Sequence, residues 1–190
     1  GDDVSGVLAI KAPWPGQMRT IYGDHGRFEN TYFQQYKGYY FTGDVCRRDE
    51  DGYYWITGRV DDVINVAGHR LGTKELESAC LTVQEIAEAS VVPVADELKG
   101  RVPDIYVSLK PGYQPSKEIE NGVVKSIEKE IGKIARPKHV WIVPDMPKTR
   151  SGKIMRRVLA AISNHADVGD VTTLANPEIV EEVRRMVQSS

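Results

Sequence analysis

The sequence changes character at Val63-Ile64-Asn65-Val66-Ala67-Gly68-His69-Arg70-Leu71-Gly72-Thr73. Before this stretch, Pro and Gly interrupt short β-type runs, whereas after it apolar runs alternate with helical periods. Within it, residues 63–66 predict a strand, residues 68–72 predict a turn, and Thr73 is a plausible N-cap for a helix. We therefore expect a separate module to begin near Asp61.

Three further strands and three further helices are predicted downstream. Short β-branched runs at residues 89–94, 105–109 and 139–143 are typical of buried strands. Apolar residues at steps of four predict a helix over residues 119–131, and other helices are expected to begin near Lys153 and at Pro177. This alternation predicts an α+β fold, in which a short mixed sheet is flanked by helices.

Residues 1–60 differ from this module because they are rich in turns and aromatic residues. The Asp51-Gly52 pair, which lies between a polar and an aromatic run, predicts a β-hairpin. The chain starts at Gly1, and its first strand-like run has no obvious preceding partner. We therefore expect the chain to be a fragment, in which a β-rich part, residues 1–60, precedes the module that begins near Asp61.

Composition excludes several classes of protein. The 25 Lys and Arg residues against 27 Asp and Glu residues give a formal charge of −2, which provides no bulk attraction for nucleic acid. Two cysteines cannot build a disulfide framework or a thiolate zinc site. No apolar run approaches the roughly 20 residues that a membrane span needs, and the N-terminus lacks signal-peptide features. We therefore expect a cytoplasmic protein that binds neither membranes nor nucleic acid.

Three segments could carry chemistry: Tyr40-Phe41-Thr42-Gly43-Asp44, residues 58–72, and Pro147-Lys148-Thr149-Arg150-Ser151-Gly152-Lys153-Ile154. Taken singly, each has a structural explanation, as a strand that ends in a turn, as surface charge, or as a solvated basic loop. The third segment could also meet a phosphate, although it lacks the second glycine of a P-loop. The residues alone leave both alternatives open.

Taken together and in this order, the three segments resemble the adenylate-forming acyl-CoA synthetases. The resemblance runs from about residue 4 to about residue 187 and includes residues 14–17, 53–59 and 169–174. It implies that a carboxylate and ATP form an acyl-adenylate and pyrophosphate, after which coenzyme A displaces AMP. The substrate expected from the resemblance is acetate, with propionate or another short-chain acid as the alternative.

The resemblance also implies roles for individual residues. Asp44 would bind the ribose hydroxyls of ATP or AMP, Arg59 would lie near the ribose and a phosphate, and Arg70 would lie near a phosphate. Lys153 would be the catalytic lysine, which stabilises charge during adenylation. The resemblance also implies that residues 1–60 are the β-rich end of a larger, truncated N-terminal domain and that residues 61–190 are a small, mobile C-terminal domain. Asp61 would be the hinge about which this domain rotates between the two half-reactions.

Coenzyme A and magnesium sites follow from the same resemblance. Ala67 and Gly68 would line the path of the coenzyme A thiol, and Mg²⁺ would lie near Leu81, Val83 and Ile86. The family has Ser where Ala67 stands, and its metal site uses a His where Val83 stands. These departures put a polar contact to coenzyme A and the metal site in question.

Two further expectations concern coenzyme A binding and regulation. The family has an Arg that meets the 3′-phosphate of coenzyme A where Glu128 stands, so this phosphate would be held differently or less tightly. Lys153 would be a target of a lysine acetyltransferase and a deacetylase, because acetylation removes the charge needed for adenylation. The 190 residues alone are expected to be inactive, which leaves a non-catalytic module that is acetylated as another alternative.

Overall fold

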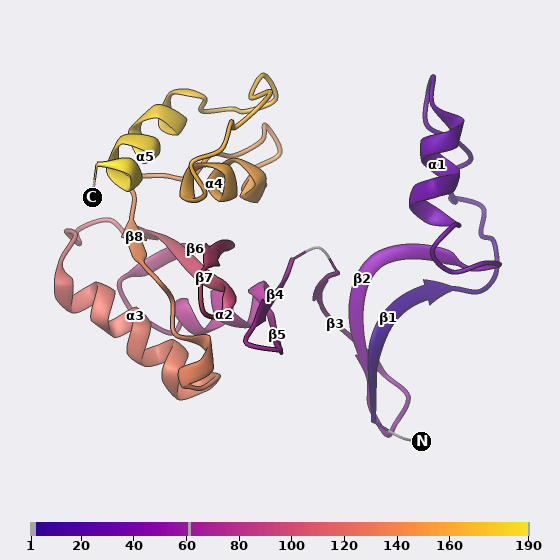
Figure 1. The fold of residues 1–190 in the computed structure, drawn as a ribbon, viewed down its shortest axis with the longest axis horizontal. Coiled ribbons are helices and arrows are strands. Elements are labelled where there is room, and N and C mark those ends of the chain that lie inside the picture. Colours follow the sequence, from indigo (N-terminus) through magenta and orange to yellow (C-terminus); the bar gives the residue numbers. More distant parts are fainter. Residues whose placement is uncertain (1–2, 61, 190) are drawn as a thin grey trace. The chain divides into compact units, whose positions relative to one another are not determined.

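A computed structural model describes residues 3–60 and 62–189 of the chain, so the predicted hinge residue Asp61 lies outside the described residues. The chain divides into two compact units, Gly1–Asp62 and Val63–Ser190. Figure 1 shows the elements of each unit. We call them the first unit and the second unit and describe each by itself.

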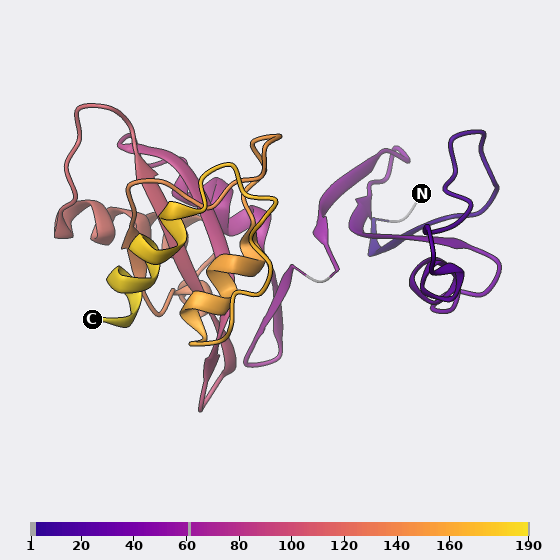
Figure 2. The same ribbon diagram turned by 90° about the horizontal axis from the view of Figure 1, so that it is seen from above.

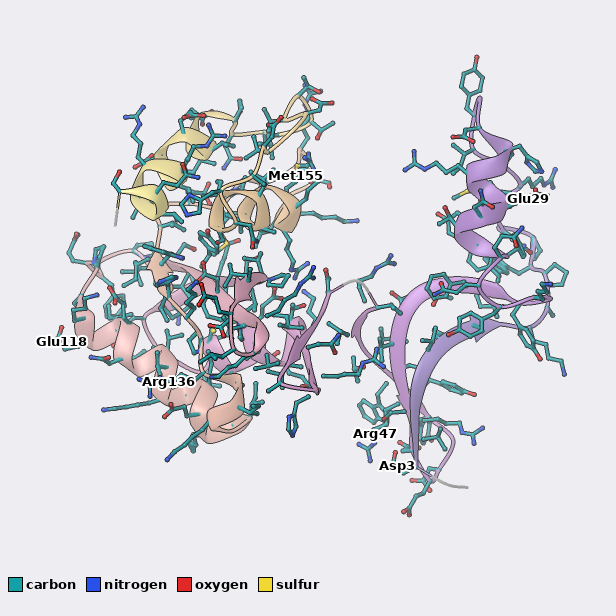
Figure 3. The ribbon with its side chains drawn as sticks, in the orientation of Figure 1. Asp3, Glu29, Arg47, Glu118, Arg136 and Met155 are labelled. Atoms are coloured by element: carbon teal, nitrogen blue, oxygen red, sulfur yellow. The ribbon has the colours of Figure 1, made fainter. Side chains whose placement is uncertain are left out.

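The first unit is built on an antiparallel sheet of three strands. These are β1 (Val4–Ile10), β2 (Tyr40–Arg48) and β3 (Tyr54–Arg59), with β2 in the centre. The predicted hairpin at Asp51-Gly52 joins β2 to β3, and Gly52 has a φ of 89°. Asp3 and Arg47 form an ion pair of 2.7 Å beside the start of β1, as Figure 3 shows.

Helix α1 (His25–Tyr32) belongs to the same unit. Asp24 caps it by accepting a hydrogen bond from the backbone N–H of Arg27 at 2.9 Å. The helix is held beside β2 by aromatic packing, in which the ring of Tyr32 stacks on Tyr40 with 5.0 Å between centroids.

The second unit contains a five-stranded mixed sheet with helices on both faces. Its strands have the order β5-β4-β7-β6, and β8 pairs in parallel with β7. The sheet and its helices confirm the fold that the sequence predicts. In chain order the elements are β4 (Val63–Val66), β5 (His69–Gly72), α2 (Thr73–Cys80), β6 (Ile86–Asp96), β7 (Gly100–Leu109), α3 (Lys117–Glu130), η1 (Lys133–Ala135), β8 (Val140–Ile142), α4 (Arg156–Ser163) and α5 (Glu178–Gln188).

The two faces of this sheet carry two separate hydrophobic cores. Along β7, Ile105 and Val107 pack with α2 and α3, whereas Tyr106 between them packs with α4 and α5. Figures 1 and 2 show α4 and α5 together on one side of the sheet and α3 on the other. All three side chains are fully buried, and such burial contributes about 1.5–3 kcal/mol for a large apolar residue. The sheet is therefore fixed from both sides.

The segment after β4 differs from the prediction in two ways. Residues 69–72 form strand β5 instead of a turn, because the reversal is made by Ala67 and Gly68 alone, which both have positive φ. The N-cap of α2 is Gly72, and Thr73 is already helical. The prediction of Thr73 as N-cap is therefore wrong, and its buried hydroxyl has no hydrogen-bond partner among the described residues.

The helix expected near Lys153 begins later, at Arg156. The backbone of Lys148 and Ile154 forms a β-bridge, so these residues are committed to a hairpin and cannot join the helix. The other two helices agree with the prediction. Ser116 caps α3 by accepting from the N–H of Ile119 at 3.3 Å, and α5 follows directly after Pro177.

Candidate functional site

In the first unit, Asp44 and Arg59 lie opposite each other on β2 and β3. The guanidinium of Arg59 donates to a carboxylate oxygen of Asp44 at 3.4 Å and to the carbonyl of Thr42 at 3.2 Å. Gly43 makes room for this arrangement, because a Cβ there would lie 2.6 Å from the guanidinium. Its φ of 77° also favours glycine. An acceptor and a planar cation therefore stand side by side at one end of the sheet.

In the second unit, Ala67 and Gly68 form the turn between β4 and β5, and Arg70 follows on β5. Their φ values of 48° and 85° define a tight turn that matches the twist of a hairpin. The N–H of Ala67 donates to the carbonyl of Lys99 at 3.1 Å, which ties the turn to the start of β7. Ala67, Gly68 and Arg70 are all exposed, so the hairpin presents a bare backbone with a cation two residues away.

Lys153 lies on a hairpin that we call the lysine loop, residues 147–155. The N–H of Thr149 donates to the carbonyl of Lys153 at 2.8 Å, and the N–H of Gly152 donates to the carbonyl of Thr149 at 2.8 Å. The N–H of Met155 closes the loop by donating to the carbonyl of Pro147 at 2.8 Å. The backbone of Lys153 is therefore fixed, while its side chain is exposed.

Lys148 anchors the start of the lysine loop. Its ammonium lies 2.7 Å from a carboxylate oxygen of Glu88 and 2.8 Å from one of Asp145. Partial burial works against the charges of both Asp145 and Lys148, but their hydrogen bonds and the attraction between opposite charges together outweigh it. The pKa of Asp145 therefore lies below its usual range and the pKa of Lys148 above it. Lys148 is therefore a structural anchor of the lysine loop, whereas Arg150 and Lys153 are exposed.

The structure thus groups the residues singled out by the sequence into three sets. Asp44 and Arg59 are neighbours in the first unit. In the second unit, Ala67, Gly68 and Arg70 share one hairpin, and Lys153 has a loop of its own. The three sets combine a carboxylate, two guanidiniums and an ammonium, which are groups suited to a ribose and to phosphate oxygens.

The residues expected near magnesium do not fit a metal site. Leu81, Val83 and Ile86 offer only backbone oxygens, and the carbonyl of Val83 already accepts from the N–H of Ile86 at 3.1 Å. Magnesium prefers carboxylates and a near-octahedral set of oxygens. Within residues 3–60 and 62–189, no three His, Cys, Asp or Glu side chains gather into a metal-binding group. These three residues therefore do not provide a magnesium site.

Sequence reasoning missed a hydrogen-bonded carboxylate in the second unit. Asp104 on β7 is buried and lies 2.9 Å from the ring Nδ1 of His139, and it accepts from Trp141 at 2.9 Å and from Ser163 at 2.8 Å. Trp141 lies on β8, His139 directly precedes β8, and Ser163 lies on α4. The carboxylate therefore links β8 and α4 to β7. Its partners lie up to 59 residues away, and no local pattern could have indicated them.

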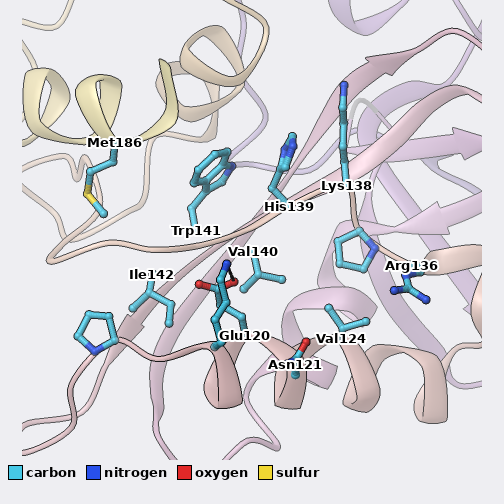
Figure 4. A pocket seen from close by; sticks show the side chains of 13 residues that line it. Glu120, Asn121, Val124, Arg136, Lys138, His139, Val140, Trp141, Ile142 and Met186 are labelled. Atoms are coloured by element: carbon cyan, nitrogen blue, oxygen red, sulfur yellow. Dashed lines mark hydrogen bonds and ion pairs between the residues drawn. The ribbon is translucent and has the colours of Figure 1, made fainter. Parts of the chain in front are cut away.

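A cavity of about 680 Å³ lies between α3 and β8, and His139 and Trp141, which contact Asp104, are among its lining residues. Figure 4 shows Glu120 and Val124 of α3 on one side, and Trp141 of β8 with Met186 of α5 on the other. None of the predicted site residues lines this cavity. Cys80 is not a candidate nucleophile, because burial raises the pKa of its thiol to about 12 and keeps it protonated.

Comparison with known proteins gives a family match and close relatives. Residues 75–153 match the family described as AMP-binding enzyme C-terminal domain. The chain is 55% identical to an acetyl-coenzyme A synthetase of Rhodobacter capsulatus over 95% of its length, and 53% identical to one of Penicillium chrysogenum over 100%. It spans only 28% and 29% of these relatives' own lengths.

The fold is also found in solved structures. The acetoacetyl-CoA synthetase of Streptomyces lividans matches 99% of this chain with a TM-score of 0.83 and 21% sequence identity, over 29% of its own chain. At this identity the likeness concerns the fold alone. Among the described residues, no helix has the length and apolar character to cross a membrane.

Proposed function

We infer that this chain, which is homologous over nearly its whole length to the C-terminal part of acetyl-coenzyme A synthetases, is that part of an AMP-forming acetate–CoA ligase. The observation that carries the proposal is 55% identity over 183 residues. Residues 1–60 would complete the large adenylation domain, and residues 61–190 would be its mobile C-terminal domain. The chain alone would lack the acid and adenine pockets and would be inactive.

In the first half-reaction, acetate attacks the α-phosphate of ATP and pyrophosphate leaves. Asp44 would accept hydrogen bonds from the ribose hydroxyls, since an ionised carboxylate offers only acceptors. Arg59, which already contacts Asp44, would meet the nearby phosphate oxygens, and Arg70 would do so from its own hairpin. Lys153 would lie between the acetate and α-phosphate oxygens, where its charge stabilises the transition state.

In the second half-reaction, the thiol of coenzyme A attacks the acetyl carbonyl and AMP leaves. The exposed turn at Ala67 and Gly68 would line the thiol's path, because Gly68 has no side chain and Ala67 only a methyl group, which allows close approach to the backbone. The 3′-phosphate would meet a mixed pair of charges, since Glu128 lies 3.3 Å from the guanidinium of Arg136. Arg136 would then offset the repulsion from the carboxylate of Glu128.

Two finer proposals follow from the same assignment. Acetylation of Lys153 by a lysine acetyltransferase would switch adenylation off, and a deacetylase would restore it. The exposed position of this side chain supports access by such enzymes. We also propose that the enzyme acts in the cytoplasm, on the basis of sequence features alone.

The test compares AMP formation by the longer protein that carries this chain with acetate, propionate and butyrate, each with and without coenzyme A. Lys153→Ala should reduce acetate-dependent pyrophosphate exchange by about 10²–10³, because a charge-stabilising donor contributes about 2.7–4 kcal/mol. Thioester formation from supplied acetyl-adenylate should change far less.

Each result separates two assignments. A preference for propionate would name another short-chain acyl-CoA synthetase. No turnover with any of the three acids by a folded protein would contradict the ligase assignment and favour a non-catalytic module. Equal loss of both half-reactions in Lys153→Ala would contradict the role given to Lys153.

A further inference from the structure

The lysine loop is fastened at its far end by an ion pair that spans 79 positions of the chain. Arg156, the first residue of α4, stands three residues after Lys153. Its guanidinium donates to both carboxylate oxygens of Glu77 on α2, at 2.7 and 2.8 Å from one nitrogen and 2.9 Å from another. Such bidentate geometry fixes direction as well as distance.

The carboxylate of Glu77 is enclosed by partners from three elements. Its side chain is only 7% exposed. Besides Arg156 on α4, the backbone N–H of Val91 on β6 donates to it at 3.3 Å, and Lys74 on α2 donates at 3.0 Å. Glu77 therefore joins α2, β6 and the start of α4 at one point.

The other end of the lysine loop is anchored independently by Lys148, which contacts Glu88 and Asp145. Two anchors hold the ends of a nine-residue hairpin, and the backbone hydrogen bonds described above hold its middle. Lys153 stands nearer to the Arg156 anchor. A change at Arg156 would therefore act on the end of the loop that carries Lys153, while the Lys148 anchor keeps the other end attached.

We propose that Glu77 is a positioning residue, which acts through Arg156 to set the direction in which the loop presents the Lys153 ammonium. This inference rests on the proposed function, in which Lys153 serves adenylation. Misplacement of a reacting group by about 1 Å can cost 10²-fold in rate, so an anchor of this kind affects the rate of the step that uses Lys153. Glu77 itself touches neither substrate nor nucleotide.

The experiment uses Glu77→Gln in the longer protein that carries this chain. Glutamine keeps the size and one acceptor but removes the charge that holds Arg156. Acetate-dependent pyrophosphate exchange should fall by about tenfold or more in kcat, with the KM for acetate changed less than twofold. Thioester formation from supplied acetyl-adenylate should stay within about twofold, which also shows that the variant is folded.

Two further variants separate positioning from general stability. Arg156→Lys, which keeps the charge, should retain more exchange activity than Arg156→Met. In the double variant of Glu77→Gln and Lys153→Ala, exchange should be no slower than in Lys153→Ala alone, because Glu77 acts only through Lys153. Glu120→Gln is the matched control, since it breaks the Lys117–Glu120 pair of 2.7 Å on α3 and should alter neither half-reaction.

An equal loss of both half-reactions in Glu77→Gln, or a further loss in the double variant, would overturn the positioning role and leave the proposed function intact. Exchange that is independent of Lys153 would overturn the proposed role of Lys153 and this inference with it. Lys153-dependent exchange that is unchanged by Glu77→Gln would overturn this inference alone.

Discussion

Ala67 is unusual at the scale of single residues, because a β-carbon is poorly tolerated at its φ of 48°. Within the described part of the chain, only His165 shares a positive φ among residues other than glycine. Strain of this kind is retained where the surrounding structure fixes it and is often found at functional positions. The hydrogen bond from Ala67 to Lys99 is one such constraint.

Ala67→Gly should therefore stabilise the second unit. Removal of the β-carbon relieves about 1–2 kcal/mol of left-handed strain, and the greater freedom of glycine in the unfolded chain offsets part of it. We expect a net gain of about 0.5–1 kcal/mol, measured by denaturant unfolding. Ala175→Gly, at an exposed position without positive φ, should instead lower stability. A loss in both variants would contradict the strain argument.

The sequence proposes candidate site residues, but it does not identify the residues that hold them in place. Lys153, Asp44 and Arg70 were proposed because short motifs around them resemble those of a known family. The pairing of Arg156 with Glu77 joins positions 79 residues apart, and only the packing of α4 against the sheet brings them together. Physical partners of this kind depend on tertiary structure, which a local pattern does not encode.

At the scale of elements, the lysine loop is held by charges that respond to pH. The pKa of Asp145 is lowered in the folded state, so its contribution to stability is present above about pH 4 and is lost as the pH falls through the folded value. The pKa of Lys148 is raised, so its contribution is complete below about pH 10 and is lost at higher pH. The anchor is thus fully formed between these limits.

Asp145→Asn should flatten the acid limb of the stability profile. Between about pH 5 and about pH 3, the Tm of the wild type should fall more than the Tm of the variant, since the variant lacks the carboxyl of Asp145, whose pKa is lowered in the folded state. Glu181→Gln, which removes an exposed pair with Arg184, serves as the control and should follow the wild type. Parallel curves for wild type and Asp145→Asn would refute the prediction.

Strands were predicted best where burial on both faces of the sheet produces a continuous apolar, β-branched run. The runs at 89–94 and 105–109 lie within β6 and β7, whose residues contribute to both cores. Prediction failed for β5, because His69 and Arg70 are polar and exposed and the glycines at positions 68 and 72 are typical of a turn. It also placed the start of α4 too early, because the backbone of Ile154 is engaged in a long-range hairpin that apolar spacing does not reveal.

At the scale of the whole molecule, the two units differ in how much apolar surface they bury. The second unit has its own cores on both faces of its sheet. In the first unit, Trp55 and Ile56 on β3 are each 58% exposed, and Tyr54 beside them is equally so. A three-stranded sheet with such exposed side chains has little to hold it together.

Residues 63–190 should therefore fold without the first unit. Expressed alone, they should unfold in one cooperative transition by circular dichroism and calorimetry. Residues 1–62 alone should show no such transition, because a small sheet without a covering layer cannot offset its conformational entropy. A gradual, non-cooperative melt of residues 63–190 would contradict this expectation.

The strands of the second unit's sheet are paired over very different lengths, so parts of the sheet can open separately. Strands β6 and β7 are paired over ten positions, whereas β4 meets β7 at the single pair Val66–Gly100. The β4–β5 hairpin can thus separate from β7 by giving up one ladder pair and the buried contacts of Ile64, Val66 and Leu71, while the β6–β7 ladder opens only when the unit unfolds. Amide protons in β4 and β5 will exchange with solvent through such local openings, faster than those of β6 and β7. The hairpin thus has an opening equilibrium of its own, set by one ladder pair and three buried apolar side chains.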